Sequence, residues 1–219
     1  MMFTAASAHA ADVVGKFSAV EGRVEVMREG KLPAVIAGIG TTISANDLIK
    51  TKSDSKAEII FNDGNILRIA QRSRIDISEY ATGGKAVISM PDGKVEAIVP
   101  KQIAKRIAVS PGANKFEIRT INAVGGVRGT DFLASYEGDV SRFIVKEGVV
   151  AVYNLAFPDM PVLVTAGNMT VVKEDRQPTT PEPAPSEIIK EYEMETTPAS
   201  SLPQTMLHKD LMRFIGCNK

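Results

Sequence analysis

The chain has 219 residues, of which 44% are hydrophobic and 24% charged, so it can bury a core and is too apolar to be disordered throughout. Its 26 basic residues balance 26 acidic ones, which argues against a nucleic-acid partner because such proteins carry a basic surface. The single cysteine, Cys217, excludes an internal disulfide.

The first residues indicate export. Met1 to Ala8 is small and apolar, and Ala8-His9-Ala10 has the small-x-small form that signal peptidase cleaves. The stretch is short and lacks a basic start, so a misplaced start or an ordinary terminus are the alternatives. We expect residues 1–11 to be a partial signal peptide. No run reaches the ~18 apolar residues that a membrane-spanning helix needs.

Acidic residues followed by glycine occur six times, and short runs rich in Val, Ile and Phe lie between them. Glycine supplies the positive φ of a tight turn, so these pairs predict β-hairpins. Residues 13–17 and 23–27 are expected to form the first hairpin, and residues 12–174 an all-β domain. The six pairs are Glu21-Gly22, Glu29-Gly30, Asp63-Gly64, Asp92-Gly93, Glu137-Gly138 and Glu147-Gly148.

Two blocks of sequence carry a series of separated motifs. The first contains Asn46-Asp47, Ile49 to Thr51 and the Phe61 to Gly64 turn. The second contains Val127 to Phe132 and Glu147 to Val149. In this order they resemble the FecR-type domain, and the resemblance covers residues 14–173. The motif residues are Asp47, Thr51, Phe61, Asp63, Gly64, Val127, Arg128, Gly129, Thr130, Phe132, Glu147 and Gly148.

The resemblance implies a periplasmic all-β domain, a two-sheet sandwich or roll that looks like a jelly roll or short solenoid, with no catalytic role. Family members of this kind include membrane-spanning regulators that relay a signal to a sigma factor. This sequence shows no sigma-factor-binding helices, membrane-spanning helix or receptor-docking domain. We therefore do not expect it to hold a sigma factor itself.

The sequence predicts neither catalysis nor a metal or other cofactor. Without the leader, His208 is the only histidine, and it lies in the tail, where a rigid nucleophile–base arrangement is difficult to build. His208 and Cys217 alone do not make a metal site. Paired carboxylates in such a chain are usually solvated turn residues.

Two further segments favour structural interpretations. The glycines of Gly125 to Thr130 predict a bulge or a close chain crossing, although their N–H groups beside Arg128 leave anion binding as an alternative. The segment from 101 to 115 has no acidic residue and forms a basic patch, interpreted as a solvated face or as a contact for an anionic partner. Its residues are Lys101, Lys105, Arg106 and Lys115.

Composition changes after Lys173. Residues 175–185 are proline-rich and predict an extended linker. The tail, residues 186–219, predicts a short acidic helix with Ser186 as N-cap and a second helix beginning near Thr205. The second helix places four apolar residues on one side, and we expect that stripe to contact a partner: Leu207, Leu211, Phe214 and Ile215.

Together these features predict a non-enzymatic, periplasmic FecR-like interaction module, a scaffold or accessory subunit of a cell-envelope complex. Its partner would be another envelope protein, reached through the tail or a sheet edge, and self-association is left open. One alternative is a β domain that binds an envelope glycan or a small anionic ligand, although the chain has no Trp. Another is a sensor component that acts through a separate membrane partner.

Overall fold

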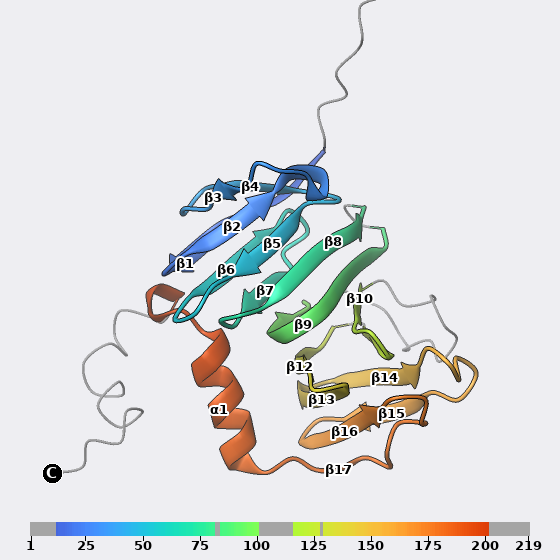
Figure 1. Ribbon diagram of the computed structural model, residues 1–219. Helices are drawn as coiled ribbons and strands as arrows, with labels where there is room; N and C mark the ends of the chain where they lie inside the picture. The colour runs from blue at the N-terminus through green and yellow to red at the C-terminus, as the bar shows by residue number, and fades with distance from the viewer. Residues whose placement is uncertain (1–11, 82–83, 101–115, 128, 202–219) are drawn as a thin grey trace, which may run out of the picture.

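The computed structural model describes residues 12–81, 84–100, 116–127 and 129–201. The strands form a roll of two layers, and one long strand, β9 (Ala86–Ile98), takes part in both (Figure 1). In order across the layer, sheet A contains β4 (Thr42–Ser44), β1 (Val13–Glu21), β6 (Lys56–Phe61), β7 (Ile66–Ile69), β9, β12 (Asp131–Glu137), β13 (Val140–Glu147), β16 (Asn168–Lys173) and β17 (Glu182–Pro183).

Sheet B contains β3 (Val35–Ile36), β2 (Val24–Met27), β5 (Leu48–Thr51), β8 (Arg74–Tyr80), β9, β10 (Phe116–Arg119), β11 (Ala123–Val127), β14 (Val149–Asn154) and β15 (Val162–Thr165). Neighbouring strands are antiparallel except for β9 and β10, which are parallel. The all-β, two-sheet roll expected from the sequence is confirmed.

A bend in β9 joins the two layers. The first half of β9 pairs with β8 and β10 in sheet B, and the second half pairs with β7 and β12 in sheet A. Gly93 lies at the change of sheet with φ +109°, and a Cβ there would come within 2.2 Å of the Ser73 hydroxyl. Only glycine fits this bend without displacing Ser73.

All six glycines of the acidic–glycine pairs have positive φ, as predicted. Asp63-Gly64 and Glu137-Gly138 turn tight hairpins, β6–β7 and β12–β13, and Glu29-Gly30 lies in the longer loop of the β2–β3 hairpin. The first hairpin predicted from the sequence is wrong, because Gly22 carries the chain from β1 in sheet A to β2 in sheet B. Gly148 makes the same change of sheet between β13 and β14. Glycine fixes the bend, whereas burial selects the pairing partner.

The main hydrophobic core lies between the two sheets. Along strands such as β7 and β8, buried and less buried residues alternate, which is the periodicity that a half-buried strand requires. The largest inward side chains are aromatic and come from both sheets: Phe17, Phe61, Phe116, Phe132 and Phe143.

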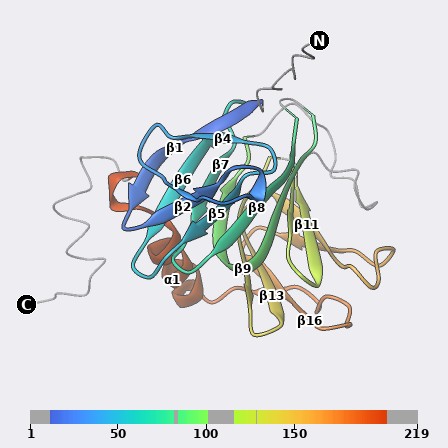
Figure 2. The same ribbon diagram turned by 45° about the horizontal axis from the view of Figure 1, so that its top comes forward.

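The proline-rich segment is extended, as its composition predicts, but it is fixed to sheet A. The Thr170 hydroxyl donates to the Thr179 carbonyl at 2.7 Å, and β17 pairs with β16. It leads into α1 (Ser186–Thr196), which lies on the outside of the roll (Figures 1 and 2). In place of a free spacer, residues 175–185 therefore form a strap along the edge of sheet A, and this segment is called the strap below.

The acidic helix predicted from the sequence is present as α1. Its N-cap position is Pro185, without a side-chain cap, so the prediction that Ser186 is the N-cap is wrong. The Ser186 hydroxyl hydrogen-bonds the adjacent Glu187 carboxylate instead of a backbone N–H group. A short 3₁₀ turn, η2 (Ala199–Ser201), follows α1 and packs against β1. No described helix is long and apolar enough to cross a bilayer.

Candidate functional site

The first family-motif residues tie turns together inside the domain. The Asp47 carboxylate is 1% exposed and accepts the backbone N–H groups of Ser44 and Glu29 at 2.9 and 3.1 Å. The Thr51 hydroxyl donates to the Ala70 carbonyl at 2.6 Å and accepts the Ser73 N–H at 2.9 Å. Both side chains are therefore satisfied by the protein itself.

The Phe61 to Gly64 turn is held by Tyr80. The Tyr80 hydroxyl donates to the Asp63 carboxylate at 2.9 Å, and its ring stacks on Phe61 with centroids 4.2 Å apart. Burial raises the pKa of Tyr80, so its hydroxyl stays protonated and remains a donor at neutral pH. Gly64 completes the turn with φ +86°.

The second motif block forms a close crossing between β12 and the turn before β14. Val127 and Phe132 are fully buried, and the Thr130 hydroxyl donates to the Val149 carbonyl at 3.1 Å. A Cβ on Gly148 would lie 2.9 Å from the Gly129 carbonyl. The described motif residues thus build corners of the roll, and none of them lines either of the two hollows described below.

A chain of ion pairs covers the centre of the outer face of sheet A. Glu96 on β9 is fully buried and accepts from Arg68 at 3.0 Å and Lys146 at 2.5 Å. Arg68 also binds Glu58 at 2.8 Å, and Lys146 also reaches Asp131 at 3.2 Å. Burial lowers the pKa of Lys146, but hydrogen bonds and nearby carboxylates outweigh it and raise that pKa overall.

Helix α1 lies against this charged face. Its Glu193 pairs with Lys146 at 2.8 Å, and its Glu195 pairs with Lys94 at 2.7 Å. The ammonium group of Lys56 donates to the Met194 carbonyl in the last turn of the helix. These lysines oppose the negative end of the helix dipole, which the helix's own carboxylates would otherwise reinforce.

The apolar contact of α1 is small and centred on one tyrosine. Tyr192 is 2% exposed and packs on Leu133 and Ile144. Its hydroxyl hydrogen-bonds Ser135 at 2.8 Å and accepts from Arg142 at 2.9 Å. The helix is therefore positioned as much by polar contacts as by burial.

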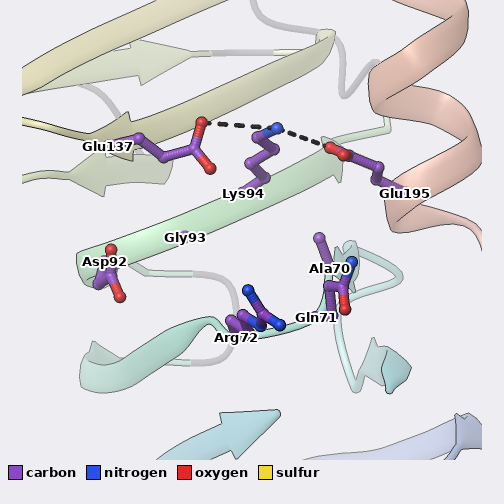
Figure 3. Close-up of a pocket in the computed structure, with 8 residues that line it drawn as sticks. All are labelled: Ala70, Gln71, Arg72, Asp92, Gly93, Lys94, Glu137 and Glu195. Atoms are coloured by element: carbon purple, nitrogen blue, oxygen red, sulfur yellow. Dashed lines mark hydrogen bonds and ion pairs between the residues drawn. The ribbon is translucent and has the colours of Figure 1, made fainter. Parts of the chain in front are cut away.

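Two hollows flank α1 on the outer face of sheet A. The smaller, about 260 Å³, is shown in Figure 3, where Lys94 lies between Glu137 at 3.5 Å and Glu195 at 2.7 Å. The larger, about 590 Å³, lies between β12, β13, β16 and the strap. Charges of both signs line each hollow, for example Arg72 and Asp92 in the smaller one.

The two outer edges of sheet B carry exposed apolar side chains. On β3 and the loops that flank it they are Leu32, Val35, Ile36 and Ile39, with Leu32 80% and Ile39 71% exposed. At the β15 edge they are Leu155, Phe157, Met160 and Leu163. Such groups of neighbouring apolar side chains are typical of contact surfaces.

The described residues contain no histidine, no cysteine and no group of three potential metal ligands. On sheet A, Glu58, Glu96 and Asp131 are paired with Lys or Arg, so what the arrangement offers is charge and shape for recognition. The glycines of β11 follow a regular ladder without a bulge, and Gly125 makes a close approach: a Cβ there would lie 2.5 Å from the Phe143 ring.

Several predicted positions lie outside the described residues. They are the leader (1–11), the basic patch (Lys101, Lys105, Arg106 and Lys115), Arg128, and the apolar stripe of the tail (Leu207, Leu211, Phe214 and Ile215). The ion pairs under α1 were not predicted from the sequence. Their signal was present, since Glu58, Arg68, Glu96 and Lys146 alternate with apolar residues on their strands.

Comparison with known proteins shows that the family model described as FecR protein matches residues 47–151 of this chain. Two crystal structures of a "putative anti-sigma factor" from Parabacteroides distasonis ATCC 8503 resemble the fold at 15% identity. The first, at 1.65 Å resolution, has a TM-score of 0.53 over 77% of this chain and 74% of its own. The second, at 2.50 Å, has a TM-score of 0.54 over 76% and 73%. No curated protein matches the chain.

Proposed function

The chain contains a domain of the FecR family, and from that premise we propose that it is a non-enzymatic protein-interaction module of the cell envelope. It acts in the periplasm as a scaffold or accessory subunit of a larger assembly. Contact with its partner, another envelope protein, is through the C-terminal tail, an edge of the β domain, or both. The leader-like residues 1–11 support export.

The exposed apolar edge of sheet B at β3 is the observation that carries this proposal. Leu32 and Ile39 hold most of their surface in solvent at the end of an open sheet. Open edges offer backbone groups for pairing, and apolar side chains there add a driving force for association. The described residues hold no nucleophile–base arrangement with histidine or cysteine that would favour catalysis instead.

A signalling role is the second candidate. The solved structures with this fold are described as a putative anti-sigma factor, which supports a sensor component acting through a separate membrane partner. Glycan binding receives less support, because Tyr80, Tyr153 and Tyr192 are at most 7% exposed, and among the described aromatic side chains only Tyr136 and Phe157 have substantial exposure.

The test is affinity recovery from cross-linked envelope extracts, with mass spectrometry of the eluates. Three tagged chains are compared: the full chain, a chain ending at Ser201, and the full chain with Leu32→Glu and Ile39→Glu. The cut is placed after Ser201 because a cut at Gln177 would also remove the strap and α1. Ile121→Glu, which alters a 57% exposed isoleucine at the turn between β10 and β11, is the matched control.

A protein lost with the shortened chain assigns the contact to the tail, and one lost with the double variant assigns it to the β3 edge. A membrane signalling protein among those lost would favour the sensor role. Equal recovery from all four chains would contradict the proposed contacts. Recovery of the full chain from the cytoplasmic fraction of its host would contradict the periplasmic location.

A further inference from the structure

An apolar row lies beside α1 on the outer face of sheet A. The strand register places Ile60 opposite Ile66, and Ile66 opposite Ile98. Ile60 is 38% exposed, and the other two are partly exposed. None of the three belongs to either hydrophobic cluster. With strands about 4.8 Å apart, the row is about 10 Å long.

The described chain ends close to this row. After α1, the backbone N–H of Ala199 donates to the Glu21 carboxylate, and η2 packs on β1. The ammonium group of Lys56 also donates to the Thr197 carbonyl at 3.3 Å, and Lys56 precedes Ile60 by four residues on the same face of β6. The described chain therefore ends beside β1 and β6, and β6 is the strand that carries Ile60. Eighteen residues, 202–219, follow.

The sequence of that tail matches the row in length and polarity. A helix beginning near Thr205 would place Leu207, Leu211 and Phe214 along one side, and the seven residue steps from Leu207 to Phe214 rise about 10 Å. Residues 197–204 would make a connection of ordinary length for two antiparallel helices. The isoleucine row and this apolar stripe thus have the same extent.

Charge favours the same arrangement. Helix α1 carries four glutamates and one lysine, whereas residues 202–219 carry three Lys or Arg residues and one aspartate. Two neighbouring helices of opposite net charge attract each other. The hollows on the other side of α1 are lined by charges such as Arg72, Asp92 and Glu137, so they suit an apolar stripe less well.

We propose that residues 205–215 dock on the row formed by Ile60, Ile66 and Ile98, as a second helix antiparallel to α1. In the free protein the tail then rests on its own domain, and a partner that takes the tail must compete with this row. This docking is a property of the protein without its partner, and it does not depend on which surface the partner binds.

The test uses the full chain and its single cysteine. A nitroxide spin label on Cys217 is combined with isotope labelling of the isoleucine methyl groups, and the methyl NMR signals are recorded with the label oxidised and reduced. The expected result is selective loss of the Ile60, Ile66 and Ile98 signals. Ile36 and Ile121, which are exposed elsewhere, should keep their signals.

A mixture of spin-labelled chain without isotopes and isotope-labelled chain without the nitroxide separates the two modes of contact. The proposal requires no signal loss in this mixture. Signal loss there, loss centred on Ile36, or no loss at all in the doubly labelled chain would overturn it.

Leu211→Glu tests the apolar stripe without touching the described domain. It is expected to restore all three isoleucine signals, whereas Lys209→Gln, which changes the polar side of the predicted helix, should leave the losses in place. If the losses persist with Leu211→Glu, the stripe is not what holds the tail, and the proposal fails.

Discussion

Gly125 is a position where one missing side chain decides how closely two layers approach. It lies in the middle of β11 with an ordinary strand conformation, so no turn requires glycine there. Its Cα faces the ring of Phe143 from β13 in the other sheet, and a Cβ would lie 2.5 Å from that ring. The Gly-Gly pair in the sequence is thus explained by packing.

Replacing Gly125 by alanine is expected to destabilise the protein by about 1–3 kcal/mol, because the Phe143 ring has to move within a packed core. Urea unfolding measures the change. Gly38→Ala is the control, since a Cβ at Gly38 meets nothing within 4 Å and its φ is not positive. A loss of the same size in both variants would contradict the steric explanation.

Glu58 links stability to pH. Burial raises its pKa, but hydrogen bonds with Arg68 and Ser18 outweigh burial and lower that pKa below the ordinary value of 4.5. The unfolded chain therefore takes up this proton at a higher pH than the folded chain does. The stabilisation is present above 4.5 and is lost as the pH falls through the lowered pKa.

Glu58→Gln is accordingly expected to reduce the free energy of unfolding at pH 7 by about 1–2 kcal/mol, since it removes a charge-assisted hydrogen bond with Arg68. The difference from the unmodified chain should shrink as the pH is lowered from 5 through the lowered pKa of Glu58, as followed by thermal unfolding. A difference that stays constant with pH would show that the carboxylate charge is not responsible.

At the scale of elements, α1 depends on the sheet beneath it. It has 11 residues, no side-chain N-cap and no basic residue in its last turn. A helix of this length is marginal alone in water. Lys94, Lys146 and Lys56 supply from the sheet the positive charge that its C-terminus lacks. The helix should therefore open before the roll unfolds.

Lys94→Ala is expected to increase amide hydrogen exchange in α1 while leaving the core strands protected, because it removes the pair with Glu195 and the cation over the Tyr192 ring, 4.9 Å from its centroid. Raised salt should have a similar effect, since the pair is partly exposed. Lys190→Ala, on the same helix, is the control. Unchanged exchange in α1 would indicate that apolar burial alone holds the helix.

For the whole molecule, the strap and α1 belong to the folded unit. Two chains test this: one that ends at Ser201 and one that ends at Gln177. The shorter chain uncovers Leu133 and Ile144 and loses the burial of Tyr192, so we expect it to be less stable than the longer one by at least about 2 kcal/mol. Chemical unfolding of both measures the difference, and equal stability would show that α1 is a dispensable appendage.

The sequence allowed much of the fold to be predicted, because strands and turns have local signals. The positive-φ glycines, the buried face of each strand and the corner-forming motif residues such as Asp47 and Thr130 follow from patterns a few residues long. The pairing of β1 and β2 could not be predicted, since a turn at Gly22 is compatible with a hairpin and with a change of sheet. That choice depends on contacts between residues distant in the chain.

The sequence by itself determined that this is an all-β domain with an acidic helix after a proline-rich segment, because composition, periodicity and turn chemistry are properties of neighbouring residues; its separated motifs carry the resemblance to the FecR-type domain. Only the tertiary structure decided that the strap and α1 lie on sheet A, and that Glu96 is buried between Arg68 and Lys146. These contacts join strands and a helix far apart in sequence, and their energy depends on which faces the completed roll leaves uncovered.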